Sequence, residues 1–154
     1  MTVFPTPNRI NVIIRIDNAN INIVASKRQD AAVTVEAQNV NKEKDVEAAK
    51  NVIIELVNNV LHVKTTKTWQ RFTNKNKAAV NINLELPTGS SIATKIAVGT
   101  ITCKGELGDA AVKTGKGNIN VEHVNFLLAK TSFGDITVTT ANDHMHNRRL
   151  DMFV

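Results

Sequence analysis

A repeated glycine is the feature that most constrains how this chain can fold. Gly99, Gly117 and Gly134 lie 18 and then 17 residues apart, and the same pattern follows each of them. The second and fourth residues after each glycine are apolar, whereas the first and third are polar. Such alternation sends successive side chains to opposite faces of a strand. The apolar positions are Ile101 and Cys103, Ile119 and Val121, and Ile136 and Val138.

A fixed period indicates that equivalent units stack on one another. The repeat therefore predicts an all-β fold, a short β-solenoid-like stack of roughly 17-residue coils built from short strands. In this stack Ile101, Ile119 and Ile136 would face one interior, and outward Thr and Asn side chains would form hydrogen-bonded ladders. An antiparallel meander is the alternative, in which each unit would contain two strands. We place the repeats at residues 88–141, with 142–154 as a cap or as the truncated tail of a longer repeat protein.

The residues before the repeat also show β patterns. Residues 10–16 alternate strictly between apolar and polar, and further strands are expected near 21–23, 33–37 and 80–86. The apolar runs at 52–56 and 60–63 flank Asn58 and Asn59. Because asparagine tolerates positive φ, this pair predicts a β-hairpin in the N-terminal region. Residues 41–50 are expected to form one short surface helix, capped by Asn41 or Asp45.

Length and composition fit one domain over residues 1–154. The chain is long enough to bury a core without a metal or a disulfide, and aromatic residues make up 4% of it. The core should therefore be filled by Ile, Val, Leu and Ala. Cys103 is the single cysteine, and we expect it to be a small buried side chain. No apolar run has the length of a signal peptide or a membrane span, so we expect a cytoplasmic location without membrane insertion.

Several segments together resemble a known family. They run from Leu-Pro-Thr-Gly at 86–89 to Gly-Asp-Ile-Thr-Val at 134–138, with supporting similarity at 6–7, 23–26 and 67–71. In these segments the chain resembles the bacterial adhesin-type β-strand-repeat family of unknown function, which is related to toastrack domains. The chain departs from the family at 19–20 and 117–118, where the family often has Gly-Asp. The resemblance implies a β-repeat fold, a link to envelope stress, and no catalytic residue.

One segment could bind a ligand. The net charge of +5 weakly favours acidic partners, although the basic residues are scattered. Basic and aromatic residues interleave between positions 64 and 77, and such a composition can contact phosphates and stack bases. The other interpretation is a connection pinned to the core by Trp69 and Phe72. The candidate residues are Lys64, Lys67, Trp69, Arg71, Phe72, Lys75 and Lys77.

No pattern in the sequence indicates catalysis, a metal or a cofactor. His144 and His146 have ligand spacing but lack an evident third ligand. Residues 113–117 resemble a phosphate loop but lack the Ser or Thr and the helix that such a loop requires. The leading hypothesis is a non-enzymatic structural or interaction scaffold that binds a protein partner or itself. The alternative is a weak nucleic-acid or anionic-surface binding protein that uses residues 64–77.

Overall fold

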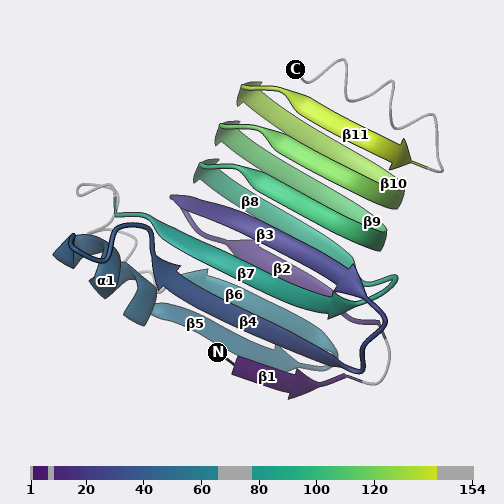
Figure 1. The fold of residues 1–154 in the computed structure, drawn as a ribbon, viewed down its shortest axis with the longest axis horizontal. Helices are drawn as coiled ribbons and strands as arrows, with labels where there is room; N and C mark the ends of the chain where they lie inside the picture. The colour runs from purple at the N-terminus through teal and green to yellow at the C-terminus, as the bar shows by residue number, and fades with distance from the viewer. Residues whose placement is uncertain (1, 7–8, 66–77, 142–154) are drawn as a thin grey trace.

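The computed structural model describes residues 2–6, 9–65 and 78–141. These residues have an all-β fold, in which eleven strands form one curved, nearly closed, barrel-like sheet and one short helix lies beside it (Figure 1). The elements are β1 (Thr2–Pro5), β2 (Asn11–Arg15), β3 (Ala19–Ser26), β4 (Asp30–Ala37), α1 (Glu43–Lys50), β5 (Val52–Val57), β6 (Val60–Thr65), β7 (Val80–Pro87), β8 (Ser91–Val98), β9 (Ile101–Lys116), β10 (Ile119–Phe133) and β11 (Ile136–Ala141).

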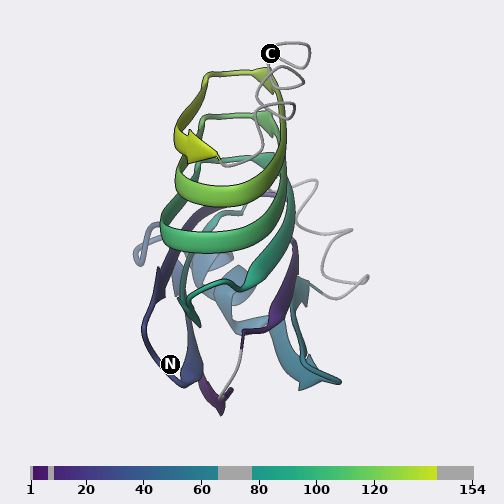
Figure 2. The same ribbon diagram turned by 90° about the vertical axis from the view of Figure 1, so that its right-hand side faces the viewer.

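The curved sheet forms two walls that face each other across the core (Figure 2). The front wall of Figure 1 has the order β1-β4-β7-β3, followed by the first parts of β9 and β10 and by β11. The back wall has the order β5-β6-β2-β8, followed by the second parts of β9 and β10. The two long strands bend from one wall into the other, and this bend joins the walls into one sheet.

The three isoleucines that were predicted to share an interior lie in register. Ile119 is opposite Ile101 on β9 and opposite Ile136 on β11, and both pairings are parallel. The side chains of Ile101 and Ile119 are 0% exposed, and Ile136 packs against the same core. Parallel pairing excludes the antiparallel meander here. The strands are longer than expected, because β9 and β10 continue through their bends for 16 and 15 residues.

The N-terminal strands belong to the same sheet as the repeats. β2 pairs in parallel with β6 and β8, and β3 pairs in parallel with β7 and β9. β2 and β3 form no hairpin, because the chain passes at Asp17 and Asn18 from the back wall to the front wall. The predicted hairpin is confirmed between β5 and β6, where Asn58 and Asn59 have φ of 51° and 64°.

The repeated glycines form stacked corners between the walls. Gly99, Gly117 and Gly134 have φ of 144°, 145° and 152°, values that side chains rarely allow. A Cβ atom on Gly117 would lie 1.9 Å from the carbonyl oxygen of Gly99, and one on Gly134 would lie 2.0 Å from that of Gly117. Each corner therefore rests directly on the backbone of the corner before it.

Asparagine side chains on the outer surface form hydrogen bonds between neighbouring strands, as expected for the asparagines of the predicted ladders. The Oδ1 atom of Asn118 accepts a hydrogen bond from the backbone N–H of Asp135 at 2.9 Å. The Oδ1 atom of Asn20 accepts one from the N–H of Thr100 at 3.0 Å, and the side-chain amide of Asn22 donates one to Oδ1 of Asn83 at 3.3 Å. The bonds from Asp135 and Thr100 satisfy backbone donors at the corners, and all three bonds link adjacent strands.

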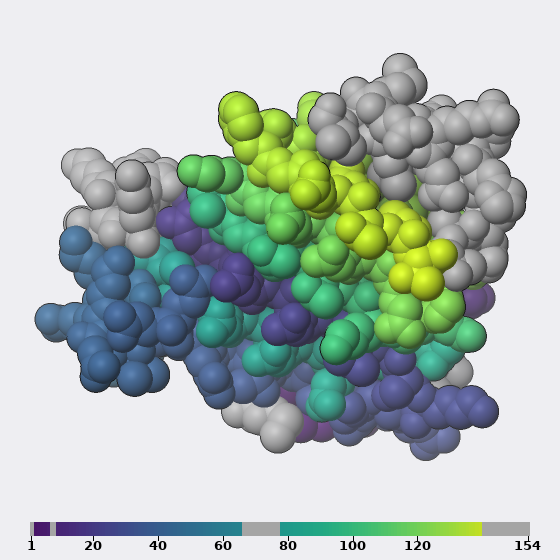
Figure 3. All heavy atoms as spheres, turned by 45° about the horizontal axis from the view of Figure 1, so that its top comes forward, coloured from purple at the N-terminus to yellow at the C-terminus, as the bar shows by residue number. Residues whose placement is uncertain are grey.

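The predicted helix forms at 43–50, but neither predicted cap holds it. Lys42 is the N-cap residue and makes no side-chain capping bond. Asp45 lies inside the first turn, where it is 3% exposed. Its carboxylate accepts hydrogen bonds from the backbone N–H groups of Asn39 at 3.1 Å and Ala79 at 2.9 Å. Asp45 therefore ties the helix to the start of β7 instead of capping it. Figure 3 shows α1 in the blue group at the left, away from the yellow-green β11.

The core is aliphatic, as the composition predicted. Its fully buried side chains include Ile14 and Leu61 from the back wall and Ile23 and Leu84 from the front wall. Cys103 is 2% exposed within this core, which confirms the expectation of a small buried side chain. Burial raises the pKa of its thiol to about 12.

Candidate functional site

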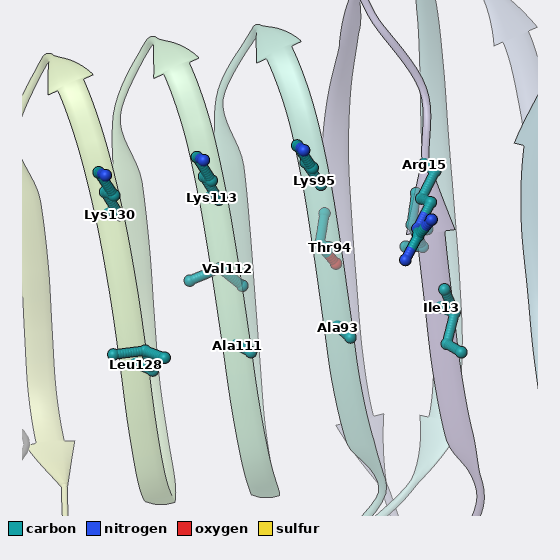
Figure 4. A pocket seen from close by; sticks show the side chains of 11 residues that line it. Ile13, Arg15, Ala93, Thr94, Lys95, Ala111, Val112, Lys113, Leu128 and Lys130 are labelled. Carbon is teal, nitrogen blue, oxygen red and sulfur yellow. The ribbon is translucent and has the colours of Figure 1, made fainter.

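Five neighbouring strands of the back wall carry a basic residue at equivalent positions. Arg15 on β2 is opposite Lys64 on β6 and Lys95 on β8. Lys95 is in turn opposite Lys113 on β9, which is opposite Lys130 on β10. All five side chains are exposed, and Figure 4 shows four of them at one level across their strands. We call these five residues the basic row. Because neighbouring strands are about 4.8 Å apart, the row is about 19 Å long.

An apolar row runs beside the basic row. On β2, β8, β9 and β10 the outward side chains two residues earlier are Ile13, Ala93, Ala111 and Leu128, which lie in register with one another, and on β6 the equivalent residue is His62. We call these four residues the aliphatic lane. The alanines in its middle are small, whereas Ile13 and Leu128 at its ends are large. The lane and the four basic residues on the same strands, all of the basic row except Lys64, line a depression of about 330 Å³ (Figure 4).

Strand alternation explains why these side chains lie on one surface. Ile14, Thr94 and Val112 each stand between a lane residue and a basic residue on the same strand, and all three are buried. Their burial fixes the parity of the strands, so the residues on either side must point outward. The core of the back wall thereby holds both rows in place.

The charges of the basic row are compensated at one end. The Nζ atom of Lys64 lies 3.9 Å from Oε1 of Glu55 on β5, and both side chains are about half exposed. No carboxylate of residues 2–6, 9–65 or 78–141 lies within ion-pair distance of Arg15, Lys95 or Lys113. Like charges directly opposite on neighbouring strands destabilise a sheet. Arg15, Lys95 and Lys113 in the middle of the row therefore form a strip of uncompensated positive charge beside an apolar surface.

The candidate residues from the sequence have mixed outcomes. Lys64 lies on β6 and belongs to the basic row. The histidines at 144 and 146 lie outside the described residues. The phosphate-loop-like segment at 113–117 is the end of β9 and a glycine corner, and strand β10 follows it. The other members of the basic and aromatic segment also lie outside the described residues: Lys67, Trp69, Arg71, Phe72, Lys75 and Lys77.

Sequence reasoning missed the basic row, although part of its signal was present. Each of the three aligned repeat units begins with a lysine, namely Lys95, Lys113 and Lys130. Stacking equivalent units places equivalent residues side by side, so the repeat itself contained this part of the row. Arg15 and Lys64 precede the recognised repeats, and only the parallel pairing of β2 with β6 and β8 adds them.

The described part of the chain contains no candidate metal site. Within it, no group of three His, Cys, Asp or Glu side chains is close enough to hold a metal ion. The Nε2 atom of His123 lies 3.6 Å from Oε1 of its neighbour Glu122, and both side chains are partly exposed. Among these residues there is also no helix with the length and apolarity needed to cross a membrane.

No protein-family model matches this chain, and the curated proteins contain no significant match to it. The resemblance to the adhesin-type β-strand-repeat family therefore stays a prediction. The surface formed by the basic row and the aliphatic lane is the strongest candidate for a binding site on the described residues.

Proposed function

We propose that this chain is a non-enzymatic interaction scaffold that binds an acidic protein partner on the outer surface of its back wall. The scaffold in this proposal is a short β-solenoid-like stack. Three features support it: the chain passes alternately through the two walls from β8 to β11, the pairings between these strands are parallel, and glycine corners stack on one another. Such a stack displays side chains at regular intervals along one axis.

The basic row is the observation that carries the proposal. Arg15, Lys95 and Lys113 stand in direct register without a nearby carboxylate from the described residues. An acidic partner would relieve the repulsion between them, and the positive strip would speed its association. The aliphatic lane adds apolar contact beside these charges, and a surface of apolar centre and charged border is typical of protein interfaces.

The composition of the lane favours a protein over a nucleic acid as the partner. Surfaces that bind single-stranded nucleic acid combine positive charge with aromatic side chains on which bases stack. The lane consists of Ile13, Ala93, Ala111 and Leu128, which offer no aromatic ring. Lys64 would contact an acidic protein and a nucleic acid alike, so the affinities for an acidic polypeptide and for single-stranded DNA have to be compared directly.

Fluorescence anisotropy with labelled poly-L-glutamate tests the proposal on the full chain. We expect binding at low salt that weakens as salt is added, and a loss of affinity of more than about tenfold in the double variant Lys95→Glu/Lys113→Glu. The matched control is Lys50→Glu/Lys104→Glu, which makes the same change in net charge at exposed positions outside the row.

Three outcomes would contradict the proposal. The first is no binding at low salt, and the second is an equal loss of affinity in both double variants. The third is tighter binding of an oligo-dT probe that the Lys95→Glu/Lys113→Glu variant abolishes, which would assign the surface to nucleic acid. Circular dichroism of each variant would confirm that the fold is retained.

A further inference from the structure

We infer that the segment bound by the basic row is an acidic amphipathic α-helix that lies across the strands of the back wall. This inference rests on the proposed function and specifies the shape of the partner. The basic row and the aliphatic lane run in parallel, and both cross β2, β8, β9 and β10. A matching ligand needs an acidic stripe and an apolar stripe side by side along one axis, and an amphipathic helix has such stripes.

The spacing of the rows distinguishes a helix from an extended peptide. Equivalent side chains of the basic row recur about every 4.8 Å, which is the distance between neighbouring strands. A helix returns to the same face about every 5.4 Å, so over four intervals the mismatch grows to about 2.4 Å. An extended peptide returns about every 6.8 Å, and its mismatch over the same length is about 8 Å, more than one strand spacing. Flexible lysine side chains can move far enough to compensate for the small mismatch with a helix, but not for the large mismatch with an extended peptide.

The length of the row sets the length of the helix. A row of about 19 Å corresponds to about 13 helical residues at 1.5 Å per residue. Acidic residues three or four positions apart would then face successive members of the row from Arg15 to Lys130. At the other end the Glu55 carboxylate already lies near Lys64, so the helix should depend least on that lysine.

The depression in the lane indicates where an apolar anchor would bind. Ala93 and Ala111 are exposed and small, whereas Ile13 and Leu128 flank them with larger side chains. A leucine or phenylalanine near the middle of the helix would fill this space, as anchors do in grooves that bind helices. The position of the small residues thus predicts one central apolar anchor.

Two synthetic peptides of about 15 residues test the inference. The first has a glutamate stripe beside a leucine stripe on one helix, and the second has the same composition in an order that separates the stripes. We expect the first peptide to bind at least about tenfold more tightly and to gain helical circular dichroism on binding. The comparison uses the full chain and reports affinity by fluorescence anisotropy.

A variant that fills the depression separates the inference from the proposed function. Ala93→Leu/Ala111→Leu changes two exposed positions and leaves every basic residue in place. We expect it to weaken binding of the helical peptide about tenfold and to weaken binding of poly-L-glutamate, which has no apolar stripe to contact the lane, by much less. If both peptides bind equally, or the filled variant binds the helix as well as before, the helix inference is wrong although poly-L-glutamate binding stands. If poly-L-glutamate and both peptides fail to bind, the proposed function is wrong as well.

Discussion

The hydroxyl of Thr131 donates a hydrogen bond of 2.9 Å to the carbonyl oxygen of Gly117. Thr131 points into the core from the back wall and is 0% exposed, whereas Gly117 forms the corner between β9 and β10. The same relationship occurs one unit earlier, where the hydroxyl of Thr114 donates to the carbonyl oxygen of Gly99 at 3.2 Å. A buried threonine therefore pairs with the carbonyl oxygen of each of these two corners, which a turn without secondary-structure partners would leave unpaired.

Replacing Thr131 by valine should destabilise the protein by about 1–2 kcal/mol. Valine keeps the shape of the side chain but leaves the Gly117 carbonyl without this buried donor, and an unpaired buried polar group costs about that much. Urea unfolding followed by circular dichroism would measure the change. Thr137→Val is the control, because Thr137 is exposed on β11 and its replacement should change stability by no more than about 0.5 kcal/mol. Equal effects would show that the corner bond does not contribute.

Gly117→Ala should be more damaging than the loss of that hydrogen bond. The new Cβ atom would stand 1.9 Å from the Gly99 carbonyl oxygen, and the residue would have to keep a φ of 145°. We expect a loss of at least about 3 kcal/mol, because strain and a backbone clash act together.

Gly89→Ala is the matched control for this substitution. Gly89 also has a positive φ, of 85°, but the nearest atom to an added Cβ is a side-chain carbon of Arg9 at 3.6 Å. Its replacement should therefore show the cost of strain alone, about 1–2 kcal/mol. Equal midpoints for the two variants in a denaturant titration would contradict the stacking of the glycine corners.

Substitutions at neighbouring positions of β10 test the parity of the strand. Ile119→Asp places a charge among aliphatic side chains at a position that is 0% exposed, and we expect it to cost more than about 4 kcal/mol or to prevent folding. Asn120→Asp changes the adjacent residue on the outer side of the strand, and its effect should stay near 0.5 kcal/mol. Thermal melts would compare them. A similar melting temperature for both variants would mean that the assigned parity is wrong.

The glycine repeat predicted the register of the C-terminal strands, and a related pattern without glycine occurs earlier in the chain. Glycine alignment correctly placed Ile101, Ile119 and Ile136 in register. The N-terminal strands have the same Asn-Ile-Asn pattern at 20–22 and again at 81–83, but without the glycine. At the first of these positions Asn18 and Ala19 stand in place of the glycine, so alignment on glycine does not include this strand. Insertion of β2 and β3 between later strands joins residues about 80 positions apart, and local patterns do not specify such contacts.

The candidate site was predictable only where the repeat was recognised. Lys95, Lys113 and Lys130 follow from the alignment, because equivalent positions stack. Arg15 and Lys64 join them through pairings between distant strands. The small size of Ala93 and Ala111 has no functional meaning in the sequence alone, since alanine is common in strands and helices alike. Their meaning comes from the larger Ile13 on the adjacent strand, and that neighbour depends on the topology.

Asp45 should be more important for stability than its place in a short surface helix indicates. Its carboxylate accepts hydrogen bonds from the backbone N–H groups of Asn39 and Ala79. Asp45→Ala would leave the N–H groups of Asn39 and Ala79 without this acceptor at a buried position. We expect the free energy of unfolding, measured by denaturant titration, to fall by about 2–3 kcal/mol. Glu47→Ala removes an exposed carboxylate from the same helix and should change stability little. A comparable loss in both variants would attribute the effect to helix charge instead.

Cys103 should make the protein less stable at alkaline pH. Burial raises the pKa of its thiol from 9.0 to about 12, so the folded state keeps a proton that the unfolded chain releases at lower pH. The stability that the neutral thiol provides is fully present below pH 9 and is lost as the pH rises through the folded pKa. Urea unfolding at several pH values between 8 and 11 should therefore show a steeper decline in the free energy of unfolding for the natural chain than for Cys103→Val, which lacks the thiol. Parallel curves would contradict the burial of this thiol.

A thiol reagent at pH 8 provides an independent measurement, since Cys103 is 2% exposed and should react only after the protein unfolds.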